Sequence, residues 1–346
     1  MNPSKKCLVT GGAGFIGSHL VESLLARGHC VTVVDDESTG QRQNLARCIN
    51  HPQLRLIAGD VGRWSLIEEV TRDIDEVYHL AAAVGVALIA SRPIESIERN
   101  IYPTELLLKA LRIKAAAGKL IPFFLASTSE VYGKNPKPVW TEDDDLVFGA
   151  TTRARWSYGA SKAIDEFLAL ACWREYRLPV VIGRFFNVVG PRQTGAYGMV
   201  LPRFVDAALA SRPLVVHDDG RQVRCFAHVN DVVEAVIRLM ECPSAVGRAF
   251  NIGSDEPVSI LELAQRVIRV TASSSPIEFQ SYADAYDEDF EDIRRRVPDL
   301  SRIRGTIDYP LAYNLEAIIR ELVRPSGGAT VATAPYRQGS REVSGR

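Results

Sequence analysis

The stretch TGGAGFIG, residues 10–17, is the part of the sequence that decides the fold. A short apolar strand, Cys7–Thr10, is predicted before it, and a helix, Phe15–Ala26, is predicted after it from the helical spacing of its isoleucine and leucines. Two overlapping patterns, G-x-G-x-x-G and G-x-x-G-x-x-G, are formed by Gly11, Gly12, Gly14 and Gly17. A turn without Cβ atoms lets the backbone approach a pyrophosphate at the positive end of a helix. The alternative is a plain tight turn, but the flanking elements favour a dinucleotide site.

The next predicted strand, Cys30–Val34, ends in an acid, as such a site requires. The carboxylate of Asp35 can accept hydrogen bonds from ribose hydroxyls, and its charge would repel a 2′-phosphate, so NAD is favoured over NADP. Asp36 could share this role. Asp60 and Val61 follow a third predicted strand, where the acid could reach the adenine amino group; this signal is weaker.

Strands and helices alternate up to about Ile182, which predicts a doubly wound α/β fold with a parallel sheet. After Phe186 proline and glycine become frequent and the predicted helices shorten, as expected for a smaller, interleaved α/β substrate-binding lobe. We therefore predict a Rossmann domain at 1–185 and 224–253, a substrate lobe at 186–223 and 254–324, and a disordered tail at 325–346.

The composition argues against several classes of protein. The 346 residues have a formal net charge of -1, so no global field favours nucleic acid or a membrane surface. The six cysteines show no C-x-x-C spacing, which predicts a reduced, cytoplasmic protein without a metal site. No signal peptide is expected, and the longest apolar stretch, Leu80–Ala90, is too short to span a bilayer.

The sequence YGASK, residues 158–162, predicts the catalytic pair. The i, i+4 spacing places Tyr158 and Lys162 on one face of a helix. A tyrosine pKa of about 10 is too high for a base at neutral pH, but a neighbouring ammonium and an oxidised nicotinamide would both lower it. Tyr158 could then take a proton from a sugar hydroxyl while hydride leaves the same carbon. By itself this pattern is common and usually marks only a helix surface.

A run of hydroxyl and acidic side chains ends the predicted strand Phe123–Ala126 and strengthens that interpretation. Doubly wound folds hold their ligands at this carboxyl edge of the sheet. The simpler alternative is a hydrogen-bonded strand end. The candidate residues are Ser127 for the cofactor and Thr128, Ser129 and Glu130 for catalysis.

Taken together, these motifs resemble those of the extended short-chain dehydrogenases, the NAD-dependent epimerase/dehydratase family that acts on nucleotide-sugars. TGGAGFIG, Asp35, HLAA at 79–82, STSEVYG at 127–133 and YGASK stand in the family's order, and the resemblance extends over roughly residues 7–323. It implies a nucleotide-sugar substrate, NAD as cofactor and a homodimer. It also implies further cofactor contacts, from Phe15, Ile16, Leu80, Ala81, Ala82 and Asn100, besides Tyr158 and Lys162.

The substrate residues are likewise implied by the resemblance. Asn187, in RFFN, resembles a diphosphate contact, and Arg192 belongs to the turn that follows it. Arg224 resembles an arginine that binds the diphosphate, and Arg296 resembles a sugar-site arginine. Two arginines suit a diphosphate because guanidinium binds phosphate oxygens bidentately; for any single arginine, a surface ion pair is the common alternative.

Each reaction of the family begins with oxidation at C4 of the sugar. Glu130 favours a decarboxylase similar to those that act on UDP-glucuronate, because galactose-type 4-epimerases usually have a small or apolar residue there. Arg155-Trp156, Arg224-Cys225-Phe226 and the 290–298 segment also resemble the bacterial decarboxylase of aminoarabinose synthesis. In that enzyme type the residues that match Ser129, Glu130 and Arg296 serve decarboxylation and reprotonation, so the resemblance implies that these three are catalytic. The alternatives are a UDP-sugar 4-epimerase, a 4,6-dehydratase and, least favoured, a non-catalytic dinucleotide sensor. Pro103 departs from the family pattern, and we expect it to kink the helix Ile94–Ile113.

Overall fold

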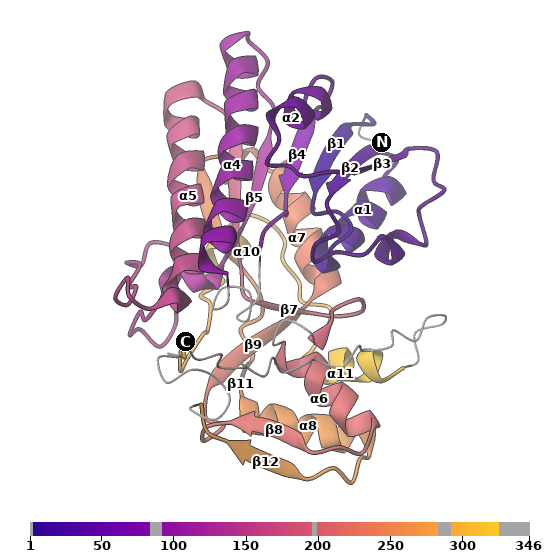
Figure 1. The fold of residues 1–346 in the computed structure, drawn as a ribbon, viewed down its shortest axis with the longest axis vertical. Coiled ribbons are helices and arrows are strands. Elements are labelled where there is room, and N and C mark those ends of the chain that lie inside the picture. Colours follow the sequence, from indigo (N-terminus) through magenta and orange to yellow (C-terminus); the bar gives the residue numbers. More distant parts are fainter. Residues whose placement is uncertain (1–2, 84–91, 196–198, 283–291, 325–346) are drawn as a thin grey trace, which may run out of the picture.

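The computed structural model describes residues 3–83, 92–195, 199–282 and 292–324. The predicted tail lies outside these residues. Figure 1 shows a large α/β lobe with a smaller lobe packed against one end of its sheet.

A seven-stranded sheet of parallel neighbours, in the order β10-β6-β5-β4-β1-β2-β3, forms the large lobe. From β1 the chain runs first to β2 and β3 on one side, and then to β4, β5 and β6 on the other. The order therefore reverses between β1 and β4, the point at which such sheets bind ligands. The strands are β1 (Lys6–Thr10), β2 (Cys30–Asp35), β3 (Leu54–Ala58), β4 (Glu76–His79), β5 (Phe123–Thr128), β6 (Val180–Phe185) and β10 (Arg248–Ile252).

Helices cover both faces of this sheet, and an apolar core lies on each side of it. In β1, Cys7 and Val9 face α1 and α7, whereas Leu8 faces α2, α4 and α5, as the two-residue period of a strand requires. Figure 1 shows α4 and α5 side by side on one face. These helices are α1 (Phe15–Ala26), α2 (Trp64–Val70), α4 (Pro93–Ala116), α5 (Ser157–Tyr176) and α7 (Val229–Glu241).

In the residues that the structure describes, the small lobe combines two short sheets with three helices around their own apolar core. Its strands are β7 (Asn187–Val189), β9 (Val223–His228) and β11 (Pro257–Ser259) in one sheet, and β8 (Leu214–His217) and β12 (Ile277–Gln280) in the other. Its helices are α6 (Val200–Leu209), α8 (Ile260–Thr271) and α11 (Leu315–Val323), and the short α10 (Ser301–Arg304) packs against β10.

One local feature differs from the sequence predictions. Residues 224–228 were expected in the large sheet, but β9 pairs with β7 and β11 in the small lobe, and the chain returns to the large lobe with α7. Pro103 lies inside α4, which is helical from Pro93 to Ala116, and the kink at this residue stays a prediction. Among the described helices, none is long and apolar enough to cross a membrane.

Candidate active site

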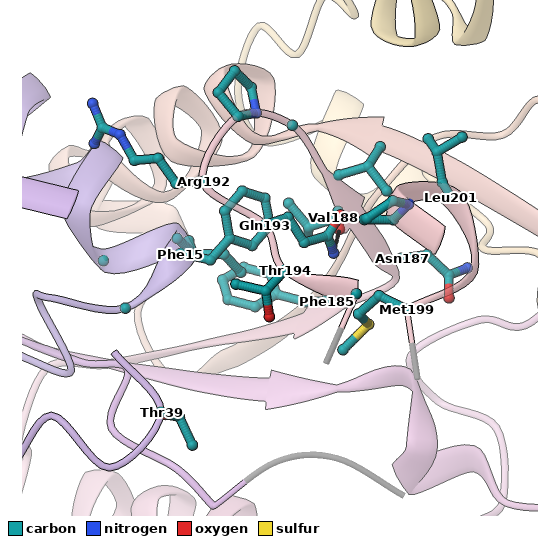
Figure 2. A pocket seen from close by; sticks show the side chains of 18 of the residues that line it. Phe15, Thr39, Phe185, Asn187, Val188, Arg192, Gln193, Thr194, Met199 and Leu201 are labelled. Atoms are coloured by element: carbon teal, nitrogen blue, oxygen red, sulfur yellow. Dashed lines mark hydrogen bonds between the residues drawn. The ribbon is translucent and has the colours of Figure 1, made fainter. Parts of the chain in front are cut away.

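A cavity of about 2110 Å³ extends along the carboxyl edge of the large sheet and continues between the two lobes. The glycine loop, the end of β5 and the start of α5 line it from the large lobe, while β7, α6 and β9 line it from the small lobe. Figure 2 shows part of this lining, with Phe15 of α1 facing residues of β7 and of the segment that follows it. The cavity therefore joins the predicted dinucleotide site to the predicted substrate site.

The glycine loop is as tight as the sequence predicted. An added Cβ on Gly17 would lie 2.1 Å from the carbonyl oxygen of Gly11, and one on Gly11, whose φ is +72°, would lie 2.7 Å from the amide nitrogen of Ala81. Helix α1 begins after Gly14, where no side chain caps it. The unpaired N–H groups of its first turn and the close backbone approach suit a pyrophosphate.

Asp35 lies at the end of β2 and supports this loop. Its Oδ2 accepts a hydrogen bond from the Ala13 N–H (2.8 Å), and its Oδ1 accepts one from the Glu37 N–H (2.8 Å). Burial raises the pKa of Asp35, against these two hydrogen bonds. Each oxygen keeps acceptor capacity, so the carboxylate can still bind ribose hydroxyls. The neighbouring Asp36 pairs with Arg99 of α4 at 3.2 Å.

Most of the predicted cofactor residues line the cavity, but three of the predicted set do not. Gly12, Asn100 and Lys162 are absent from its wall. The side-chain amide of Asn100 is buried and holds the backbone of Ala83, accepting from its N–H at 2.9 Å and donating to its carbonyl at 3.2 Å. Asn100 therefore positions the segment after β4 in this structure, and direct contact with a cofactor stays a prediction.

The charges around Tyr158 and Lys162 differ from those that the sequence predicted. The ammonium of Lys162 donates to Asp165 Oδ2 at 2.8 Å, and both side chains are almost fully buried. The pKa of Tyr158 is raised by burial first, and then by the charges of Glu130 and Asp165, against a hydrogen bond with Thr128. In the protein alone the pKa of Tyr158 is therefore not lowered as expected, because burial raises it; the ammonium of Lys162 is paired with Asp165.

Glu130 lies in the 3₁₀ turn η2 (Ser129–Tyr132) that follows β5. The Thr128 hydroxyl caps this turn by accepting a hydrogen bond from the Glu130 N–H. Its Oε2 pairs with Arg155 at 2.6 Å, and its Oε1 pairs with Arg296. Burial would raise the pKa of Glu130, but the two guanidiniums outweigh it and lower the pKa to about 2. Glu130 is thus a carboxylate at any physiological pH.

The predicted substrate residues fall into two groups. Asn187, Arg224 and Arg296 come from the small lobe and line the cavity. Arg192 also lines it, but its guanidinium donates to Glu22 (2.6 Å) and Ser18 (3.1 Å) of α1. Figure 2 shows Arg192 and Asn187 on opposite sides of the view.

Arg224 is already paired by a network that the sequence did not reveal. Its Nη2 donates to both carboxylate oxygens of Asp292, at 3.0 and 3.2 Å, and the Tyr282 hydroxyl donates to the same carboxylate at 2.6 Å. Burial and the neighbouring charge of Arg296 lower the pKa of Arg224 to about 10. A diphosphate would therefore compete with Asp292 for this guanidinium.

Fold and site together define a class: an α/β enzyme with a dinucleotide loop and a Tyr-Lys pair, facing a basic substrate lobe. Comparison with known proteins then identifies the family. Residues 7–253 match the model described as NAD dependent epimerase/dehydratase family, and the chain belongs to that family.

Relatives are similar over most of this chain. It is 40% identical over 321 residues to a UDP-N-acetyl-alpha-D-glucosaminuronate decarboxylase of Bacillus cytotoxicus, covering 92% of this chain and 97% of that one. It is 34% identical over 306 residues to UDP-glucuronic acid decarboxylase 1 of Arabidopsis thaliana, covering 88% and 66% respectively. A UDP-glucose 4-epimerase of Thermus thermophilus, in complex with NAD, matches with a TM-score of 0.79 and 27% identity, over 92% and 97% of the two chains. These comparisons confirm the predicted family and fold.

Proposed function

We propose that this protein is an NAD-dependent decarboxylase of a UDP-linked hexuronic acid, which it oxidises at C4 before carbon dioxide leaves. The observation that supports this most is the carboxylate of Glu130, held between Arg155 and Arg296 beside Tyr158. A cluster with more guanidiniums than carboxylates suits a substrate that carries its own carboxylate next to the reacting carbon. The names of the two decarboxylase relatives agree with this.

The glycine loop and Asp35 would hold NAD. Gly11, Gly14 and Gly17 leave room for the pyrophosphate, and the first turn of α1 supplies N–H donors. When bound, NAD⁺ would supply a hydride acceptor and a positive charge. The carboxylate of Asp35 would repel a 2′-phosphate, so we expect NADP to bind more weakly.

Arg224 and Asn187 would hold the diphosphate from the small lobe. Arg224 can form two parallel hydrogen bonds to phosphate oxygens, at the expense of its pair with Asp292. The amide of Asn187 donates to the Cys225 carbonyl at 2.9 Å, which places Asn187 next to β9 and Arg224.

Tyr158 would act as a phenolate, a form that the positive charge of bound NAD⁺ would favour. It would remove the C4 hydroxyl proton as the hydride leaves, with Thr128 hydrogen-bonded to the phenolic oxygen. The C4 ketone then makes the C6 carboxylate a β-keto acid. When the C5–C6 bond breaks, its electron pair moves to C5 and the C4 oxygen, and carbon dioxide leaves. Tyr158, now protonated, can donate to that oxygen. A proton then adds at C5, and the return of hydride and proton at C4 completes the reaction.

Glu130 acts as a fixed negative charge in this scheme. Because its pKa is about 2, it cannot itself donate a proton at neutral pH. It can instead orient a water molecule, or the buried hydroxyl of Ser129, as the proton source for C5.

The reaction is tested by incubating the purified protein with NAD⁺ and each of UDP-glucuronate, UDP-N-acetylglucosaminuronate and UDP-glucose, and resolving the products by mass and proton NMR. A product lighter by carbon dioxide from either uronate supports the proposal. An unchanged mass with inverted C4 would make the protein a 4-epimerase, and loss of water from UDP-glucose would make it a dehydratase.

We infer further that the protein is a cytoplasmic homodimer. All six cysteines are free, as expected in a reducing compartment. Helices α4 and α5 pack side by side and expose large apolar side chains away from the sheet: Tyr102, Ile113, Ile164 and Phe167. A second copy of the chain would cover them.

A further inference from the structure

Charge is balanced unevenly among the ion pairs of the active site. Lys162 pairs with one carboxylate, that of Asp165, and Arg224 pairs with one, that of Asp292. Glu130, by contrast, pairs with two guanidiniums, those of Arg155 and Arg296. These three side chains, the Glu130 cluster, are each 14% exposed or less and together carry a charge of +1.

The two arginines of this cluster come from different lobes. Arg155 lies in the 3₁₀ turn η3 (Ala154–Trp156), directly before α5, and Arg296 lies in the 292–300 segment of the small lobe. That segment is held to β9 by the hydrogen bond from the Arg296 N–H to the Val223 carbonyl at 3.0 Å. Arg296 thus belongs to the same part of the molecule as Arg224, which is close enough for the charge of Arg296 to lower its pKa.

Arg155, in contrast, is fixed to the element that contains the catalytic base. It precedes Tyr158 by three residues, and η3 continues directly into α5. Its guanidinium lies 5.6 Å from the ring centre of the buried Trp156. That ring is itself held closely, since a Cβ on Gly149 would lie 2.2 Å from its Nε1. Arg155 therefore has a defined position relative to Tyr158.

We propose that Arg155 determines specificity by binding the C6 carboxylate of the substrate. This inference rests on the proposed function, in which Tyr158 acts at C4 and C6 is attached to the neighbouring carbon. Arg155 lines the cavity with Tyr158 and pairs with Glu130, whose charge acts on the phenol, so we assign the C6 carboxylate to its guanidinium. In the complex, Arg155 turns part of its donors from Glu130 to the substrate, while Arg296 keeps its pair with Glu130. Two guanidiniums then face two carboxylates, and the cluster becomes neutral.

This arrangement distinguishes acidic from neutral sugars. A substrate with a hydroxymethyl group at C6 leaves the net charge of the cluster at +1 and gains no ion pair. A uronate gains a charge-assisted pair in a poorly hydrated site, where such a pair is strong. A 2-hydroxy and a 2-acetamido uronate present the same carboxylate, so both classes benefit equally from Arg155.

The test is calorimetric binding of UDP-glucuronate, UDP-glucose and UDP to the full chain saturated with NADH, so that C4 oxidation cannot begin. We expect the wild type to bind the uronate more tightly than UDP-glucose. Arg155→Gln should weaken uronate binding by about 10- to 100-fold, the range typical of a charged hydrogen bond, and change the other two affinities by less than about threefold. Arg155→Lys, which retains the charge, should recover part of the loss.

The matched control is Arg266→Gln, which removes an arginine of α8 that also pairs with two carboxylates, Glu256 and Glu262, none of the three being part of the cavity wall. It should change none of the three affinities. Equal weakening of all three ligands by Arg155→Gln would mean a purely structural role and overturn the inference, as would unchanged uronate binding. Because binding is measured without turnover, an Arg155-dependent preference for the uronate would stand even if the wild type released no carbon dioxide, which would refute the proposed reaction alone.

Discussion

The phenol of Tyr158 lies beside a hydroxyl group and near two carboxylates, and its pKa is raised by burial and by their charges. Tyr158 is therefore a neutral phenol in the protein alone, and added positive charge is needed before it can lose this proton and act as a base. Tyr158→Phe removes the proton acceptor and leaves the ring in place. We expect kcat to fall by about 10²- to 10⁴-fold, the usual contribution of a general acid–base group, while affinities for NAD⁺ and UDP change little. Unchanged turnover in this variant would show that another group is the base.

Glu130 should also make the stability of the protein depend on pH. Its pKa falls from 4.5 to about 2 on folding, so its contribution is complete above pH 4.5 and is lost as the pH falls towards 2. The shift corresponds to at most ~3 kcal/mol. Glu130→Gln should lower the free energy of unfolding at pH 6, and the difference from the wild type should narrow by pH 3.

Urea unfolding at several pH values measures this difference. Asp75→Asn, at an exposed acid that accepts a hydrogen bond from the Lys6 N–H, serves as the comparison for general effects of acid on the chain. A gap between wild type and Glu130→Gln that stays constant from pH 6 to pH 3 would contradict the expected ionisation of Glu130.

At the scale of single residues, the sequence identified the groups but not their partners. Tyr158, Lys162 and Glu130 belong to local motifs with fixed spacing, and each was found. The sequence did not reveal the pairs of Lys162 with Asp165 and of Arg224 with Asp292, although Asp165 is only three residues from Lys162. Many acids lie at such spacing, and the sequence does not show which of them is buried with the base.

The glycine loop is an element whose shape depends on missing side chains. In Gly17→Ala, the added Cβ would lie 2.1 Å from the Gly11 carbonyl oxygen, too close without movement of the loop. We expect NAD⁺ affinity to fall by about 10-fold or more, because the loop must open where the pyrophosphate binds. Fluorescence titration with NADH measures it.

Gly305→Ala is the matched control, since Gly305 also has a negative φ, of −79°, and its added Cβ would lie 3.2 Å from the nearest backbone oxygen. It should leave NADH affinity unchanged. Equal affinity of Gly17→Ala and wild type would mean that the loop does not hold the cofactor.

Periodicity predicted the elements of the large lobe well, because each strand alternates between two cores and each helix has one buried face. It failed where the choice depended on long-range pairing. The apolar residues of β9 suit either sheet, and their pairing with β7 and β11 follows from the chain path through the small lobe. Pro103 does not end α4, and the kink that we expect there stays a prediction.

At the scale of the whole molecule, the two lobes meet around the cavity and are joined by the 292–300 segment. The Trp140 N–H donates to the Val297 carbonyl (2.9 Å), and the Asp299 N–H donates to the Trp140 carbonyl (2.8 Å). Asn251 of β10 donates to the carbonyls of both Trp140 and Asp299. These hydrogen bonds hold the small lobe to the large lobe at the edge where Arg296 contacts Glu130. A ligand that binds to both lobes therefore also affects the Glu130 cluster.

The outer face of α4 and α5 is where we propose that a second copy binds. The apolar run 106–111 suits either a subunit interface or the core, and the structure buries Leu107, Leu108 and Leu111 in the core. Phe167, in contrast, is 69% exposed on α5. If a second copy covers this face, Phe167→Asp places a charge in an apolar interface and should convert the dimer to a monomer at micromolar concentration.

Sedimentation velocity distinguishes the two states. Phe279→Asp is the matched control, because Phe279 is 58% exposed on β12, in the small lobe, and should leave a dimer intact. Since the cavity is built within one chain, we expect the Phe167→Asp monomer to bind NADH and UDP as the wild type does. A wild type that sediments as a monomer would refute the dimer, and a Phe167→Asp variant that remains dimeric would place the interface on another face of the molecule.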